Sequence, residues 1–241
     1  MLQTSDRYTI KRDTLTIRGV ITSDQGQYWC RGQIRSVSSQ SNFAVSLSVK
    51  DLPRSSLTVT PDSPVFTGET VTLKCVIESH SNWRYEWYKD SVMLQTSDRY
   101  TVNRDTLTIR GVITSDQGQY WCRGQRDERP NSSQSVSVSL SVKDLKPKPE
   151  LTSDSAGAAL TGNTVTLICR MNPATGWDFY WYKHTLNSET KTQTNSYRVK
   201  IDSVSDGGQY WCRAGRGKPV YYTQYSDALW VNVTGEREHS I

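Results

Sequence analysis

The chain has 241 residues, of which 35% are hydrophobic and 10% aromatic, and it carries a formal net charge of +5 at pH 7. Its Lys and Arg residues are dispersed, which excludes the basic block or stripe typical of nucleic-acid-binding proteins. No apolar run reaches the roughly 18 residues that a membrane helix needs, so we expect membrane attachment only through a segment absent from this chain.

A long internal repeat organises the chain. Residues 1–33 recur as residues 93–125 with two differences, and a diverged copy of the end of the repeat spans residues 206–212. Such a repeat has to be identified before local structure is predicted. The three copies end at Cys30, Cys122 and Cys212, so their spacing is that of whole domains.

The register of these copies predicts the domain limits. Met1 aligns with Met93, so the first copy begins in the middle of a unit, as expected for a fragment or a mis-started gene model. We expect the C-terminal half of a truncated domain, two complete domains, and a tail or start of a stalk, at residues 1–51, 52–145, 146–235 and 236–241. Cys30 then has no partner within its own unit.

Strand patterns follow in chain order through the second unit. Apolar and polar residues alternate over residues 71–77, which predicts a strand with one buried face. The alternation returns in four more segments, at residues 83–88, 106–110, 119–123 and 135–142. Turn residues separate the segments, and the third unit repeats the scheme. Short strands at such intervals predict an all-β, antiparallel sandwich for each complete unit.

Each complete unit contains two cysteines, which predicts the disulfides Cys75–Cys122 and Cys169–Cys212 and leaves Cys30 unpaired. Paired cysteines in a Trp- and Tyr-rich β chain indicate an oxidising compartment. In the chain-entropy model, each bridge stabilises its unit by about 4 kcal/mol. The alternative is a cytosolic protein with reduced, buried thiols, which the recurrence of the spacing disfavours.

Aromatic residues recur at fixed distances from these cysteines. A Trp lies 12 residues after the first Cys of each pair (Trp87, Trp181), and a Tyr lies two residues before the second (Tyr120, Tyr210, and Tyr28 in the first copy). This arrangement resembles the immunoglobulin fold, with a core Trp on an inter-sheet disulfide and a tyrosine corner. The 35 and 31 residues between Trp and second Cys are too few for the extra strands of a variable domain, which favours constant-like sets.

Nothing in the sequence predicts catalysis. The three His residues are not paired at metal-ligand spacing, and no nucleophile elbow or phosphate loop occurs. We therefore expect neither an enzyme nor a metal or cofactor, and recognition of another protein remains.

One candidate recognition surface is the outward face of the strands that carry Trp87 and Cys122. Because Cys122 points inward, Trp121 and Arg123 should point outward together with Tyr88. These residue types are enriched at interface hot spots. The alternative is that the Trp lies flat under neighbouring Arg and Lys stems and only packs locally.

The hairpins after the second Cys of each unit form another candidate surface, because strand-end loops on a rigid sandwich often carry binding residues. Their candidate ligand contacts are Arg126, Arg129, Arg216 and Lys218, and a solvent-exposed hairpin without function is the alternative. Trp83 and Trp177 should pack inside at this end. Leu52 and Leu145, the apolar residues of the joints, either fill a domain contact or lie half-exposed.

Two acceptor motifs predict N-glycosylation at Asn131 and Asn232.

Three segments point to a family. WYKD at residues 87–90, LTIRGV at 107–112 and DQGQYWCRG at 116–124 resemble leukocyte Fc-receptor and Fc-receptor-like ectodomains, most of all the fish members. The resemblance implies the extracellular ligand-binding region of an immune cell-surface receptor, with an immunoglobulin Fc or another immunoglobulin-superfamily protein as ligand. The loops do not match at residue level, so no individual contact is carried over.

Two other functions stay open. An adhesion module or secreted decoy would bind another cell-surface protein, and a polyanion-binding protein would use the dispersed basic charge. The expected location is the outer face of the plasma membrane or the extracellular space.

Overall fold

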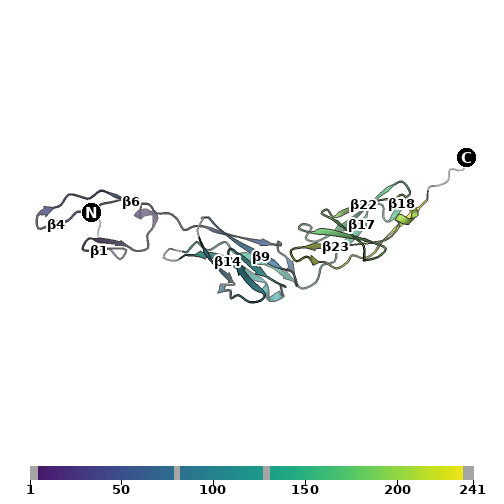
Figure 1. The fold of residues 1–241 in the computed structure, drawn as a ribbon, viewed down its shortest axis with the longest axis horizontal. Coiled ribbons are helices and arrows are strands. Elements are labelled where there is room, and N and C mark those ends of the chain that lie inside the picture. Colours follow the sequence, from purple (N-terminus) through teal and green to yellow (C-terminus); the bar gives the residue numbers. More distant parts are fainter. Residues whose placement is uncertain (1–4, 79–81, 127–130, 236–241) are drawn as a thin grey trace. The chain divides into compact units, whose positions relative to one another are not determined.

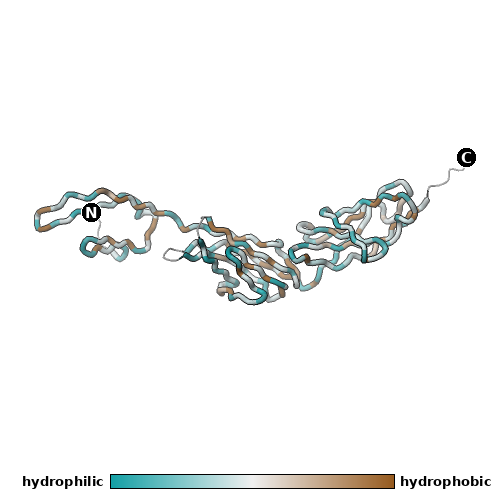
Figure 2. The backbone as a smooth tube through the Cα atoms, viewed as in Figure 1, coloured by the Kyte–Doolittle hydropathy of each residue, from teal (hydrophilic) through white to brown (hydrophobic). Residues whose placement is uncertain are grey.

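The structure, a computed structural model, describes residues 5–78, 82–126 and 131–235. The chain divides into two compact units, residues 1–53 and residues 54–241. Within the described residues the chain forms short β-strands and single 3-10 turns (Figure 1), which confirms the all-β prediction. Hydrophobic and hydrophilic residues change over short stretches of the backbone (Figure 2), and none of the described residues forms a helix that could span a membrane.

The first unit consists of small antiparallel pairs. Strands β1 (Tyr8–Lys11) and β2 (Thr14–Ile17) form a hairpin, β3 (Gly26–Tyr28) pairs with β6 (Val45–Leu47), and β4 (Gln33–Ile34) pairs with β5 (Val37–Ser38). The apolar side chains stay accessible: Leu15 is 36% exposed, whereas its repeat counterpart Leu107 is fully buried. The repeated sequence thus forms the same local strands here without an enclosed core.

The first sandwich of the second unit has two four-stranded sheets. One contains β12 (Tyr100–Asn103), β13 (Thr106–Ile109), β9 (Val71–Ile77) and β7 (Ser55–Thr60); the other contains β11 (Val92–Met93), β10 (Arg84–Lys89), β14 (Gly118–Gln125) and β15 (Val138–Leu140). Strand β16 (Val142–Lys143) pairs in parallel with β8 (Val65–Phe66). The core side chains Leu73, Leu107, Ile109 and Leu140 are fully buried.

The following sandwich repeats this plan. One sheet contains β17 (Glu150–Ser153), β19 (Thr164–Arg170) and β22 (Ser196–Lys200). The other contains β18 (Ala158–Leu160), β25 (Leu229–Thr234), β23 (Gly208–Arg216), β20 (Asp178–Lys183), β21 (Glu189–Thr192) and β24 (Tyr221–Tyr222). Tandem immunoglobulin-like sandwiches, as predicted, are the architecture of residues 54–235.

A disulfide joins the two sheets of each sandwich, Cys75–Cys122 in one and Cys169–Cys212 in the other. The indoles of Trp87 and Trp181 are each 2% exposed and belong to the same core clusters as these bridges. Cross-linking and aromatic burial act together here, because a sandwich of this size has a thin apolar core. Cys30, in the first unit, is an exposed thiol.

A tyrosine corner is present three times. The hydroxyls of Tyr28, Tyr120 and Tyr210 each donate a hydrogen bond of 2.6 Å to the backbone oxygen four residues upstream, at Asp24, Asp116 and Asp206. The carboxylate of Asp116 accepts hydrogen bonds from Arg99, Tyr100 and the Ile113 amide, and Asp24 has the matching partners in the first unit. The corner is therefore a locally encoded feature that forms with or without the enclosed core.

Candidate binding surface

Strand register fixes which side chains leave the core. Trp181 lies opposite Cys212, so the adjacent pairs Tyr182–Trp211 and Tyr180–Arg213 face outward. The preceding sandwich has the same register, with Tyr88 opposite Trp121 and Glu86 opposite Arg123. The outer faces of β10–β14 and β20–β23 thus carry equivalent residues.

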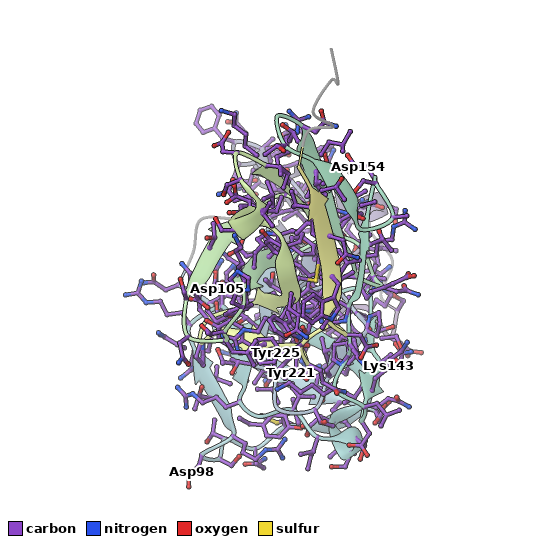
Figure 3. All side chains as sticks on the ribbon, turned by 90° about the vertical axis from the view of Figure 1, so that its right-hand side faces the viewer. Asp98, Asp105, Lys143, Asp154, Tyr221 and Tyr225 are labelled. Atoms are coloured by element: carbon purple, nitrogen blue, oxygen red, sulfur yellow. A yellow bond between two sulfur atoms is a disulfide. The ribbon has the colours of Figure 1, made fainter. Side chains whose placement is uncertain are left out.

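In the third domain, Arg213 lies at the centre of four tyrosines, which we call the tyrosine–arginine cluster. Its guanidinium carbon is 3.9 Å from the ring centroid of Tyr222, and 5.0, 5.5 and 6.0 Å from those of Tyr225, Tyr182 and Tyr180. Tyr225 and Tyr221, which flank this segment, are labelled in Figure 3. The rings orient the cation and restrict its side-chain motion.

Glu189 balances the charge of this cluster. Its Oε2 accepts a hydrogen bond of 2.6 Å from the Tyr182 hydroxyl and lies 3.5 Å from Arg213. Burial, aided by this bond to a carboxylate, raises the pKa of Tyr182 above its ordinary value. Among the described residues no hydrogen-bond partner exists for the buried Arg213 Nε. The cluster therefore presents a fixed, partly satisfied cation in an aromatic surface.

In the second domain the same positions form a simpler stack. The rings of Tyr88 and Trp121 are parallel within 4° and their centroids are 3.8 Å apart. Arg123 lies over Tyr88 at 5.4 Å and donates a hydrogen bond to Glu86. Both interpretations of the sequence meet here, because Trp121 packs flat on its neighbour and yet remains half-exposed.

The hairpin candidates are placed differently from one another. Lys218 is exposed, and Arg126 is half-exposed with its guanidinium 4.8 Å from the Trp83 ring. Arg129 lies outside the described residues. Arg216 is a correction: it is 6% exposed, so it does not contact a ligand from an open hairpin as the sequence suggested.

Arg216 instead binds the preceding domain. Its Nε donates to Glu69 Oε1 at 2.7 Å, and one terminal nitrogen donates to Glu69 Oε2 at 2.9 Å and to the Pro64 carbonyl at 3.0 Å. The guanidinium lies 4.3 Å from the Trp177 ring centroid, and Phe66 contacts both Trp177 and Tyr221. We call these residues the Glu69–Arg216 joint.

The linker leucines do not fill this joint. Leu145 is 84% exposed and Leu52 is 50% exposed, so the expectation of an apolar plug is not met. The linker is held instead by Gln224, whose amide nitrogen and side chain donate to the carbonyls of Pro147 and Lys146.

Sequence reasoning missed Glu69. Its signal was available, because the aligned turns Thr-Gly-Glu (67–69) and Thr-Gly-Asn (161–163) differ in this one residue. The glycosylation motifs lie on accessible surface: Asn131 is half-exposed, and Asn232 is exposed on β25.

Comparison with known proteins adds the family context. Residues 54–125 match the model of the immunoglobulin domain. Human Fc receptor-like protein 2 is 26% identical over 235 residues, which cover 92% of this chain and 45% of that protein. Fasciclin-2 of Schistocerca americana is 29% identical over 127 residues, 51% of this chain and 14% of that protein. The chain thus spans less than half the length of these relatives.

Solved structures show the same fold at low identity. The human OSCAR ligand-binding domain has a TM-score of 0.47 and 19% identity, with 76% of this chain and all of that chain covered. The I-band fragment I67–I69 from titin has a TM-score of 0.39 and 21% identity, with 98% and 84% covered.

Proposed function

We propose that this chain, an immunoglobulin-domain protein, is the extracellular ligand-binding region of an immune cell-surface receptor, and that its ligand is an immunoglobulin Fc or another immunoglobulin-fold protein. Similarity to human Fc receptor-like protein 2 over 92% of the chain supports this proposal. So do the segments at residues 87–90, 107–112 and 116–124, whose wording resembles the fish Fc-receptor-like proteins.

The observation that carries the proposal is the outer face of β10–β14 and β20–β23. Trp, Tyr and Arg dominate interface hot spots, and each occurs here on a rigid sheet. Stacking between Tyr88 and Trp121 and the rings around Arg213 hold these side chains in place before a ligand arrives. Binding then loses little side-chain entropy, which leaves more of the contact energy as affinity.

We assign the domains to residues 52–145 and 146–235, with the half-domain at 1–51 and the tail at 236–241. Tyr88, Trp121 and Arg123 are the proposed contacts of the second domain, and Trp211 and Arg213 are those of the third. The hairpin residue Lys218 lies exposed at the end of the third domain and can contribute at the edge.

Surface plasmon resonance of the whole chain against the immunoglobulin Fc of the same species tests the proposal. Trp121→Ala and Trp211→Ala should each weaken binding by about 30-fold, the effect of losing about 2 kcal/mol at a hot spot. Val136→Ala, at a side chain that is 82% exposed, is the control and should bind as the native chain does. Absence of binding, or equal binding by all three variants, would remove the support for this surface.

Similarity to Fasciclin-2 favours a second candidate, an adhesion module or secreted decoy that binds another cell-surface protein. The two functions separate in one experiment. Binding to cell-surface ectodomains but not to Fc, with the same loss in Trp121→Ala, would assign the surface to this second function.

A further inference from the structure

A Trp–Arg pair occurs at the loop end of both sandwiches. Trp83 and Trp177 each lie four residues before a core Trp, and Arg126 and Arg216 each lie four residues after the second Cys of a disulfide. In both pairs the guanidinium lies over the indole, at 4.8 Å in the second domain and at 4.3 Å in the third. The two pairs are therefore copies in sequence and in geometry.

The third-domain pair holds a ligand group within this chain. Trp177 is 5% exposed and Arg216 is 6% exposed, because Phe66 and Glu69 of the second domain lie against them. The Glu69 carboxylate accepts two hydrogen bonds from the guanidinium fork, and the Phe66 ring packs beside the indole. A planar guanidinium suits a carboxylate in this way, and an indole beneath it fixes its plane.

The second-domain pair differs in exposure. Trp83 and Arg126 are both half-exposed, whereas their counterparts are buried. Residues 1–53 contain no Glu, so the unit that precedes this pair in the sequence lacks the turn that fills the other one.

The rest of the chain shows that the pairing is specific. Ile34 occupies the position of Arg126 in the first copy, and in the third domain Leu160 and Asn163 replace Phe66 and Glu69. Leu160 is 51% exposed, unlike Phe66 at 3%. Charge and aromatic ring are thus present on the turn that meets a Trp–Arg pair and absent from the turn of the third domain.

We propose that Trp83 and Arg126 form a binding site for the turn of a separate immunoglobulin-like domain that presents Phe-x-x-Glu. Arg126 binds the carboxylate through its guanidinium fork, and Trp83 packs against the aromatic ring. This inference goes beyond the proposed receptor function, because the site lies at the loop end of the domain and not on its outer sheet face. It stands or falls independently of binding to Fc.

The test uses the full-length chain labelled with ¹⁵N and a backbone-cyclised peptide of residues 63–71, which contains the Phe66–Glu69 turn. The indole N–H signal of Trp83, assigned with Trp83→Phe, should shift saturably as peptide is added. The indole of Trp177 should not shift, because Glu69 already fills its site, and its signal also reports that each variant is folded.

Two changes should weaken peptide binding by about tenfold or more, the effect of losing a hydrogen bond to a charged group. One is Arg126→Gln in the chain, and the other is Glu69→Gln in the peptide. Arg110→Gln, at an exposed arginine on another edge of the domain, should bind the peptide as the native chain does. No saturable shift at about 10 mM peptide, or equal binding by Arg126→Gln, would overturn the proposal.

Discussion

Glu69 and Arg216 lie 147 residues apart in the sequence and meet through two hydrogen bonds of 2.7 and 2.9 Å. Their side chains are 2% and 4% exposed, so each charge depends on the other in place of water. Removing one partner leaves an uncompensated buried charge, whereas removing both does not. This asymmetry gives the joint a testable energetic signature.

We expect Arg216→Gln or Glu69→Gln to destabilise residues 54–235 by about 3–5 kcal/mol. The double variant Glu69→Leu with Arg216→Met should unfold at nearly the native denaturant concentration, because no charge remains buried. Arg123→Gln is the control: its pair with Glu86 is partly exposed, so its loss should cost about 1 kcal/mol or less. Urea denaturation measures all four. Single and double variants of equal stability would show that burial of the charge is not the dominant effect.

The same double variant separates stability from orientation. Apolar side chains fill space but impose no hydrogen-bond geometry, so we expect the angle between the two sandwiches to vary more. Distances between spin labels at Ser139 and Lys200, measured by electron paramagnetic resonance, should broaden relative to the native chain. A distribution as narrow as the native one would mean that the aromatic contacts of Phe66, Trp177 and Tyr221 fix the joint alone.

The repeat provides an internal control for the tyrosine corner. Tyr120 and Tyr28 make the same hydrogen bond of 2.6 Å, but Tyr120 is fully buried and Tyr28 is half-exposed. Tyr120→Phe should lower the free energy of unfolding by about 1–3 kcal/mol, because the Asp116 carbonyl loses a buried donor. Tyr28→Phe should change the stability of residues 54–235 by less than about 0.5 kcal/mol. Equal effects would contradict the burial argument.

Tyrosine ionisation should unfold the third domain in alkali. Burial raises the pKa of Tyr210 to about 12, whereas an unfolded tyrosine has a pKa near 10. The folded state therefore favours the protonated hydroxyl. Its contribution is complete below about pH 10 and is lost as the pH rises toward about 12. Melting temperature followed against pH should fall in this window for the native chain and less steeply for Tyr210→Phe. A parallel decline in both would assign the loss to other groups.

Thiol reactivity should distinguish Cys30 from the bonded cysteines. Cys30 is exposed, whereas Cys75, Cys122, Cys169 and Cys212 are in disulfides. Ellman's reagent should titrate one thiol per native chain without denaturant, and none in Cys30→Ser. A native chain without a reactive thiol would show that Cys30 is bonded to another molecule.

The architecture inside each sandwich was predictable because it is written in local periods. Inward residues recur every second position, so Cys75, Trp87 and Cys122 had to share one interior, and Trp121 and Arg123 had to leave it. These relationships depend on one domain at a time, and the structure shows them in both.

The joint was not predictable in the same way. Arg216 lies in a polar hairpin, and such a hairpin is ordinarily solvated, so its burial depends on a turn in another domain. Glu69 likewise occupies a surface turn within its own sandwich. Alternation along a strand carries no information on which ends of two domains meet, and the linker leucines, the apolar signal available there, point to the wrong residues.

The duplication creates competition during oxidative folding. Cys75 can reach two thiols in the same sequence surroundings, Cys122 downstream and Cys30 upstream, and the two loops to be closed are nearly equal in length. Loop-closure entropy therefore does not discriminate between them. Strands β2 and β3 are likewise interchangeable in sequence with β13 and the first residues of β14 as neighbours of β9. A newly made chain thus has a mispaired product built into its own sequence, and reaching the native bond depends on thiol–disulfide exchange.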